Sequence, residues 1–153
     1  MSREFPETPL VGVGAVIAQD DRVLLIRRGQ APLLGEWSLP GGVLECGETL
    51  REAVVREARE ETGLEVETGE MLGVYERVIR SEDGRVRYHY VLIDFLCRPV
   101  AGDPQAGSDA ADVRWFSRHE LPSLKLPADT LEVIERGLQA VPASPTSSPA
   151  KPA

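Results

Sequence analysis

The sequence has few residues of the kinds that build zinc sites or disulfide frameworks. Its 153 residues include only two cysteines and two histidines. The separation of Cys46 and Cys97 matches no zinc-binding spacing, and nothing else in the sequence indicates a disulfide framework. The composition therefore excludes a zinc ribbon and a disulfide-stapled domain, and a reducing, cytoplasmic location is the expectation.

Long apolar runs and an excess of positive charge are also absent. No stretch is long enough to span a bilayer, and no basic segment followed by an apolar run precedes the domain, so we expect neither a membrane helix nor a signal peptide. The 17 basic residues are outnumbered by 25 acidic ones, which gives a net charge of −8. This balance argues against a nucleic-acid polymer or an acidic membrane as partner.

The remaining composition fits one globular α/β domain over residues 8–140, since 42% of the residues are hydrophobic. Proline, serine and alanine dominate residues 141–153, which predicts a disordered tail. Residues 33–47 are expected to form a loop. Strands are predicted at 11–18, 22–28, 66–80, 86–98 and 112–116, and helices at 49–62 and 128–140.

The most informative stretch is a glycine-rich turn that leads into an acidic amphipathic helix. At about 100° per residue, Leu50 and Val54 share one side of this helix. Glu57, Glu60 and Glu61 fall on that same side. Carboxylates placed three and four residues apart repel each other, and more strongly when they are partly desolvated, so they require a compensating cation. Oxygen ligands without a Cys–His set favour Mg²⁺, with Mn²⁺ as a substitute.

The plainer interpretation is a solvated charged helix stabilised by arginine–glutamate pairs. Arg56 lies four residues from both Glu52 and Glu60, a spacing that stabilises exposed helices. That interpretation does not explain why three carboxylates follow the apolar side, so the metal-binding interpretation is preferred.

The spacing of this stretch resembles the Nudix box. Gly42, five residues, Glu48 and seven further residues lead to the run Arg56-Glu57-Ala58-Arg59-Glu60-Glu61-Thr62-Gly63-Leu64, in which Ala58 is smaller than the usual aliphatic residue. The preceding residues 35–42 also resemble the family's lead-in, and the resemblance covers roughly residues 9–122. It implies an α/β/α sandwich with a mixed sheet.

The resemblance also implies an active site. Glu57, Glu60 and Glu61 would be the metal ligands, with the carbonyl of Gly41 as a further oxygen. Arg56 would orient a carboxylate, through Glu48 or Glu57, and would not itself reach the substrate. The family hydrolyses nucleoside diphosphates linked to another moiety, by attack of water on phosphorus.

Two carboxylates are candidates for the general base that takes the proton from water. One is Glu57 in the box, and the other is Asp109 in the loop that precedes Trp115. The plainer interpretation of Asp109 is a turn-forming aspartate.

Substrate-binding residues must lie outside the box. Arg28, Arg77 and Arg87 are candidates for phosphate or ribose, and Trp37 and Tyr90 for the nucleoside. The alternatives are that the arginines protect an exposed strand edge and that the aromatic residues belong to the core.

Three functions are compared. The first is hydrolysis of a nucleoside diphosphate derivative such as ADP-ribose, although Val78 and Ile79 stand where a proline often follows the box in ADP-ribose pyrophosphatases. The second is release of pyrophosphate from an oxidised nucleoside triphosphate of the 8-oxo-dGTP type. The third is a catalytically silent nucleotide sensor, which the complete set of glutamates opposes. The resemblance further implies a homodimer.

Overall fold

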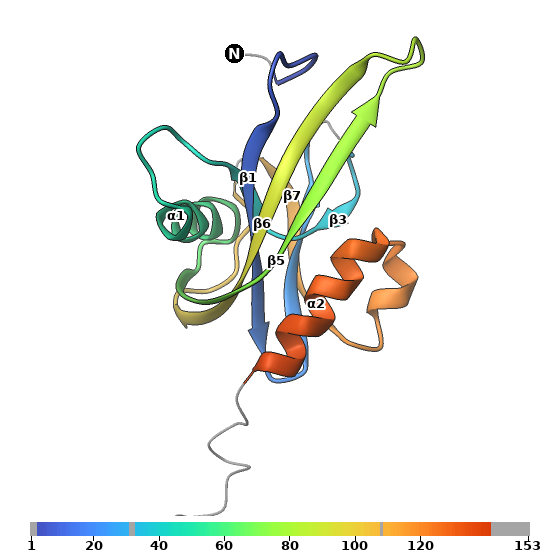
Figure 1. Ribbon diagram of the computed structural model, residues 1–153. Coiled ribbons are helices and arrows are strands. Elements are labelled where there is room, and N and C mark those ends of the chain that lie inside the picture. Colours follow the sequence, from blue (N-terminus) through green and yellow to red (C-terminus); the bar gives the residue numbers. More distant parts are fainter. Residues whose placement is uncertain (1–2, 31–32, 108, 142–153) are drawn as a thin grey trace, which may run out of the picture.

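A computed structural model describes residues 3–30, 33–107 and 109–141. Within them, seven strands form one mixed sheet between two helices, which confirms the predicted α/β fold (Figure 1). Residues 142–153 of the predicted tail lie outside the described part. The strands are β1 (Leu10–Gln19), β2 (Arg22–Arg28), β3 (Trp37–Ser38), β4 (Gly41–Val43), β5 (Glu65–Arg80), β6 (Val86–Ala101) and β7 (Ala110–Ser117). The helices are α1 (Leu50–Thr62), the 3₁₀ turn η1 (Leu121–Leu124) and α2 (Ala128–Ala140).

The sheet has the strand order β3-β2-β1-β6-β5, with β4 paired to β1 and β7 paired to β2. Only the β1–β6 pairing is parallel, and the other pairings of the described strands are antiparallel. The predicted loop over 33–47 needs a correction, because β3 and β4 lie within it. Their backbones pair with β2 and β1, a long-range contact that local turn propensity does not reveal.

Helix α1 has well-defined ends. Thr49 is its N-cap and forms a capping box with Glu52, in which each side chain accepts a hydrogen bond from the other residue's backbone N–H. Gly63 ends the helix with φ of 75°, a left-handed conformation that glycine adopts without strain. These two caps define where α1 begins and ends, and they therefore help to set the direction in which its glutamates point.

The two faces of the sheet carry separate hydrophobic cores because successive residues of a strand point to opposite faces. Val13, Ala15 and Ile17 of β1 pack in the core that includes Ala53 and Val54 of α1. The neighbouring Val16 and Ala18 pack in the core that includes Val133 and Ile134 of α2. Full burial of each large aliphatic side chain contributes about 1.5–3 kcal/mol. In the described part, neither helix is long and apolar enough to cross a membrane.

The sheet opens between β1 and β2, and this opening positions the site. The two strands pair only where Ile17–Gln19 lie opposite Arg22–Leu24. The earlier residues Gly12–Gly14 of β1 pair with β4 instead, while the later part of β2 pairs with β3 and β7. A cavity lies where the strands diverge.

Candidate active site

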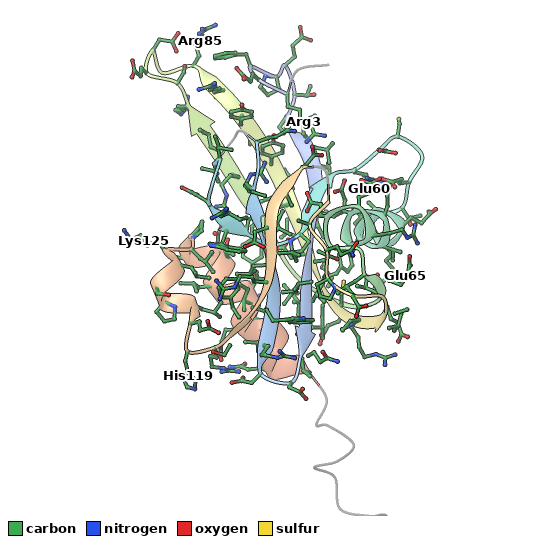
Figure 2. All side chains as sticks on the ribbon, turned by 180° about the vertical axis from the view of Figure 1, so that it is seen from behind. Arg3, Glu60, Glu65, Arg85, His119 and Lys125 are labelled. Atoms are coloured by element: carbon green, nitrogen blue, oxygen red, sulfur yellow. The ribbon has the colours of Figure 1, made fainter. Side chains whose placement is uncertain are left out.

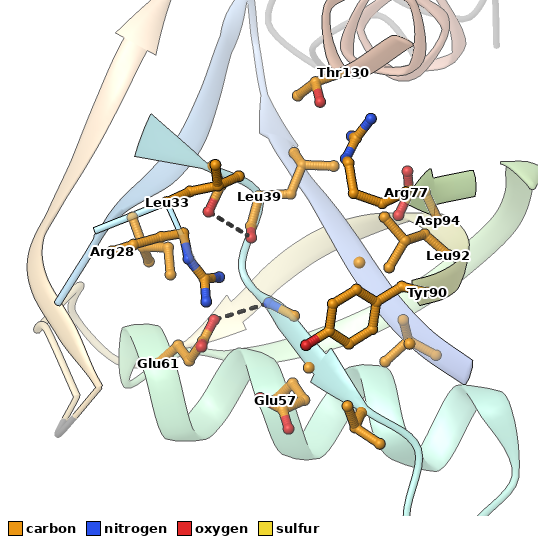
Figure 3. Close-up of a pocket in the computed structure, with 18 of the residues that line it drawn as sticks. Arg28, Leu33, Leu39, Glu57, Glu61, Arg77, Tyr90, Leu92, Asp94 and Thr130 are labelled. Carbon is orange, nitrogen blue, oxygen red and sulfur yellow. Dashed lines mark hydrogen bonds between the residues drawn. The ribbon is translucent and has the colours of Figure 1, made fainter. Parts of the chain in front are cut away.

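The cavity has a volume of about 540 Å³, within the range of small-molecule sites. Its lining comes from the N-terminal segment, the diverging strands, α1 and the start of α2. Glu57 and Glu61 of α1 lie at one end, and Arg77, Asp94 and Thr130 lie at the other (Figure 3). Residues of both helical layers of the fold thus contribute to the cavity.

Two glutamates of the box point into the cavity beside β4. Glu61 accepts a hydrogen bond from the backbone N–H of Gly41 at 2.8 Å, shown as a dashed line in Figure 3. Glu57 lies directly under Gly42, where any Cβ atom would collide with its carboxylate. Gly42 therefore has to be glycine for helix α1 to bring Glu57 this close to β4.

Arg56 connects the carboxylates around it. Its guanidinium donates to Glu48 through Nε at 2.6 Å and Nη2 at 2.8 Å, and to Glu57 through Nη1 at 2.7 Å. It also contacts the carboxylate of Glu60 at 3.2 Å and the carbonyl of Val43 at 3.2 Å. Arg56 borders the cavity, but these bonds direct its donors to the protein's own oxygens, and its paired contact with Glu48 is the geometry that arginine alone provides.

Burial and charge separate the carboxylates into two kinds. The hydrogen bonds from Arg56 lower the pKa of Glu48 to about 2. Burial raises the pKa of Glu61 to about 7, with Glu57 and Asp109 adding repulsion, while the Gly41 N–H and Arg28 oppose the shift. Burial also raises the pKa of Glu57, despite its bond to Arg56. Glu57 and Glu61 are thus carboxylates whose negative charge the fold does not fully compensate.

The predicted metal ligands form an all-oxygen set, which suits Mg²⁺ or Mn²⁺. In the described residues, however, no three acidic, histidine or cysteine side chains are already gathered into a metal-binding cluster. The physical reason is that Arg56 holds Glu57 and Glu60, whereas the Gly41 N–H holds Glu61. Burial raises the pKa of Glu57 and of Glu61, and a nearby cation would favour the ionised forms by opposing this shift.

Asp109 reaches the cavity through a loop that docks on the end of α1. The backbone N–H of Gly107 donates to the carbonyl of Glu61 at 3.1 Å. A Cβ atom at Gly107 would collide with the carbonyl of Glu60, so this loop approaches the helix as closely as only glycine allows. The Asp109 carboxylate then accepts a hydrogen bond from Gln30 at 2.9 Å and lines the cavity near Glu61.

The structure brings four of the five predicted substrate residues to the cavity: Arg28, Trp37, Arg77 and Tyr90 line it. Trp37 packs edge-on against Phe116 at 4.9 Å, so it is both a wall of the cavity and part of the α2-side core. Arg87 is not among the lining residues. It forms an ion pair with Glu4 at 3.4 Å and lies over the ring of Tyr88.

Several lining residues were not predicted from the sequence, namely Arg3, Gln30, Asp94 and Asp129. Arg3 comes from the N-terminal segment, and Figure 2 places it on the same upper side of the molecule as Glu60. Asp94 did leave a signal, because it is the one charged residue in the apolar strand run from Val91 to Cys97. Nothing local in the sequence marks Arg3 or Gln30, which depend on how distant segments meet.

Comparison with known proteins agrees with this geometry. The model of the NUDIX domain matches residues 8–137. The chain therefore belongs to the Nudix hydrolase family.

Two curated relatives differ in the substrates that their names state. An ADP-ribose pyrophosphatase of Methanocaldococcus jannaschii is 43% identical over 116 residues, which are 76% of this chain and 66% of that protein. The human 8-oxo-dGDP phosphatase NUDT18 is 32% identical over 133 residues, 84% of this chain but only 38% of that protein. Among solved structures, a MutT Nudix hydrolase from Burkholderia pseudomallei is 35% identical with a TM-score of 0.73, covering 85% of this chain and 98% of that one.

Proposed function

We propose that this protein is a Mg²⁺-dependent pyrophosphohydrolase that cleaves the diphosphate of a nucleoside diphosphate derivative such as ADP-ribose. The observation that carries the proposal is the pair Glu57 and Glu61, two undercompensated carboxylates at one end of a nucleotide-sized cavity. The archaeal relative named as an ADP-ribose pyrophosphatase supports the substrate class.

In this proposal, the carboxylates of Glu57, Glu60 and Glu61 and the carbonyl of Gly41 hold Mg²⁺, with Mn²⁺ as a substitute. When bound, such ions neutralise the pyrophosphate oxygens and lower the pKa of a bound water. Arg56 is a positioning residue, because its bonds to Glu48 and Glu57 fix the Glu57 side chain.

The reaction is attack of water on one phosphorus. The water oxygen forms a bond to phosphorus, the bond from that phosphorus to the bridging oxygen breaks, and with ADP-ribose the products are AMP and ribose 5-phosphate. The proton of the attacking water passes to a carboxylate, either Glu57 or Asp109, since both line the cavity. Comparing kcat of Glu57→Gln and Asp109→Asn, each at saturating Mg²⁺, tests which carboxylate is the base.

Four lining residues are proposed to contact the substrate. Arg28, near Glu61, is suited to a phosphate oxygen, and Trp37 and Tyr90 offer aromatic walls to the nucleoside. Arg77 is bound to Asp129 at 2.8 Å, so its contact with a substrate would be made as part of that ion pair. Arg87, which faces Glu4, is left out of this set.

A second candidate is hydrolysis of an oxidised purine nucleotide. The name of the human relative favours it, and the compact cavity suits a nucleoside triphosphate of the 8-oxo-dGTP type as well. A homodimer, implied by the family resemblance, remains a prediction that sedimentation equilibrium would test.

The deciding experiment is hydrolysis of a substrate panel in Mg²⁺, with products resolved by phosphorus NMR. The panel contains ADP-ribose, sugar nucleotides, dinucleoside polyphosphates, and normal and oxidised dNTPs. AMP with ribose 5-phosphate supports the first candidate, whereas pyrophosphate or phosphate released from an oxidised nucleotide supports the second. Tight nucleotide binding without turnover on any substrate would overturn both and favour a sensor.

A further inference from the structure

Two buried polar groups at the end of the cavity away from α1 have no hydrogen-bond partner in the described part of the chain. The side chain of Asp94, on β6, lines the cavity, and the residue is only 6% exposed. None of the hydrogen bonds among the described residues involves its carboxylate. The hydroxyl of Tyr75, on β5, is likewise buried and lacks a partner. Such groups cost free energy when they stay unpaired, so their presence at a cavity calls for an explanation.

Glycines make the space in which these two groups lie. Asp94 pairs with Gly14 of β1 on one side and with Gly73 of β5 on the other. A Cβ atom at Gly14 would collide with the Asp94 carboxylate, and a Cβ atom at Gly73 would lie 2.6 Å from the Tyr75 hydroxyl oxygen. Glycines on two strands thus leave room for two polar groups, as a preformed binding subsite requires.

The charge of this end of the cavity indicates what it binds. Arg77 forms an ion pair with Asp129, at 2.8 Å and 3.1 Å, so its positive charge is already compensated. Burial raises the pKa of Asp94 to about 6, with a further contribution from Asp129, opposed by Arg77. Two carboxylates beside one guanidinium disfavour a phosphate and favour a group that donates hydrogen bonds.

The walls around these groups favour a flat ring. Tyr90 and Leu92 of β6 and Leu39, which precedes β4, line the cavity between Asp94 and the glutamates (Figure 3). Apolar and aromatic walls with a few convergent polar groups are typical of sites that bind a nucleobase. A sugar, by contrast, presents hydroxyls on all sides and would leave many of them unpaired against these residues.

We propose that Asp94 and Tyr75 form a specificity subsite that binds the nucleobase of the substrate. Asp94 accepts hydrogen bonds from the N–H groups of the base edge, and Tyr75 contributes its hydroxyl beside it. This inference rests on the proposed function, because it assumes that the phosphates lie at the Glu57 and Glu61 end.

The test measures binding of AMP, GMP and ribose 5-phosphate by isothermal titration calorimetry without metal, together with kcat and KM on the best substrate. Asp94→Asn removes the acceptor charge, and Tyr75→Phe removes the hydroxyl. Asp20→Asn is the matched control, because Asp20 is an exposed turn residue with φ of 55°, a conformation that asparagine adopts readily.

We expect Asp94→Asn to weaken binding of the preferred nucleoside monophosphate about 10- to 100-fold, the loss typical of a hydrogen bond to a charged group. Tyr75→Phe should weaken it about 3- to 10-fold. KM should rise by similar factors while kcat changes little, and Asp20→Asn should match the unaltered protein. Binding of ribose 5-phosphate should not change, because it lacks a base.

Three results would overturn the subsite: unchanged nucleotide binding in Asp94→Asn, an equal loss for ribose 5-phosphate, or no binding of either nucleotide by the unaltered protein at millimolar concentrations. Its failure is distinguishable from failure of the proposed function. Loss of turnover in Glu61→Gln with unchanged KM in Asp94→Asn retains the hydrolase and rejects the subsite. Nucleotide binding that depends on Asp94, without turnover on any substrate, retains the subsite and rejects the hydrolase.

Discussion

The carboxylates at the two ends of the cavity differ in whether the protein supplies them with hydrogen-bond donors. At the α1 end, Arg56 binds Glu57, and the Gly41 N–H binds Glu61. At the other end, Asp94 is buried, and the hydroxyl of the half-buried Tyr75 is buried without a hydrogen-bond partner among the described residues. Under the proposed function, the protein positions its reactive carboxylates with its own donors, which preorganises them, and leaves its recognition groups for a ligand to satisfy. Substitutions at the α1 end should therefore mainly lower turnover, whereas substitutions at the Asp94 end should mainly change substrate binding and stability.

Glu61→Gln should produce the largest effect, by breaking the α1 end alone. We expect kcat/KM to fall by about 100-fold or more, because a proposed direct metal ligand is lost. The free energy of unfolding should stay equal or rise, since burial disfavours the ionised Glu61 that the variant removes. Steady-state kinetics and urea unfolding at pH 8 measure the two quantities. Full turnover at saturating Mg²⁺ would contradict the metal assignment, and the exposed Glu70→Gln serves as the control.

Arg56→Lys should be the next largest change, because it keeps the charge but loses the paired contact with Glu48. We expect a loss of about 2–3 kcal/mol in the free energy of unfolding and about a 10- to 100-fold fall in kcat, as Glu57 loses its fixed position. Arg59→Lys, at an exposed pair with Glu65, is the matched control on the same helix. Equal effects of the two substitutions would show that Arg56 is not a specific positioning residue.

Asp94→Asn should change how the free energy of unfolding depends on pH, because Asp94 is buried at the end of the cavity away from α1. The pKa of Asp94 is raised from 3.8 to about 6, so the folded state binds this proton more tightly than the unfolded state does. Its contribution to stability is therefore fully present below about pH 4 and is lost as pH rises to about 6. We expect Asp94→Asn to be more stable than the unaltered protein by about 1–3 kcal/mol at pH 7. Urea unfolding from pH 4 to pH 8 should show this difference vanish toward pH 4, and a constant difference would contradict the prediction.

Arg77→Gln should have the smallest effect, because its ion pair with Asp129 is only partly buried, with 26% and 27% of the two side chains exposed. We expect a loss of about 0.5–1 kcal/mol in thermal unfolding experiments. KM should rise only a few-fold, much less than for Asp94→Asn. A larger rise in KM for Arg77→Gln than for Asp94→Asn would move the main recognition role to Arg77.

Local signals explain how much of the fold could be predicted. Two runs of strand-forming residues separated by a polar turn predicted β1 and β2, and the amphipathic pattern ended by Gly63 predicted α1, because these patterns act within a short stretch of chain. The strands β3 and β4 were missed because each is short and depends on pairing with a distant strand.

By itself, the sequence determined the family, the fold class and the inward direction of Glu57 and Glu61, since residue spacing on a helix fixes azimuth whatever surrounds it. Glu60, predicted on the same side, is exposed, with 57% of its side chain accessible. Only the tertiary structure decided which other residues share the cavity. Asp94 faces it because Gly14 on the neighbouring strand β1 leaves room for its carboxylate, and Asp109 reaches it because Gly107 lets a loop pass against α1. Arg87, a similar arginine on the same hairpin as Arg77, faces Glu4 instead. Strand register and the opening between β1 and β2 set these outcomes, and both arise from pairing between segments far apart in the chain.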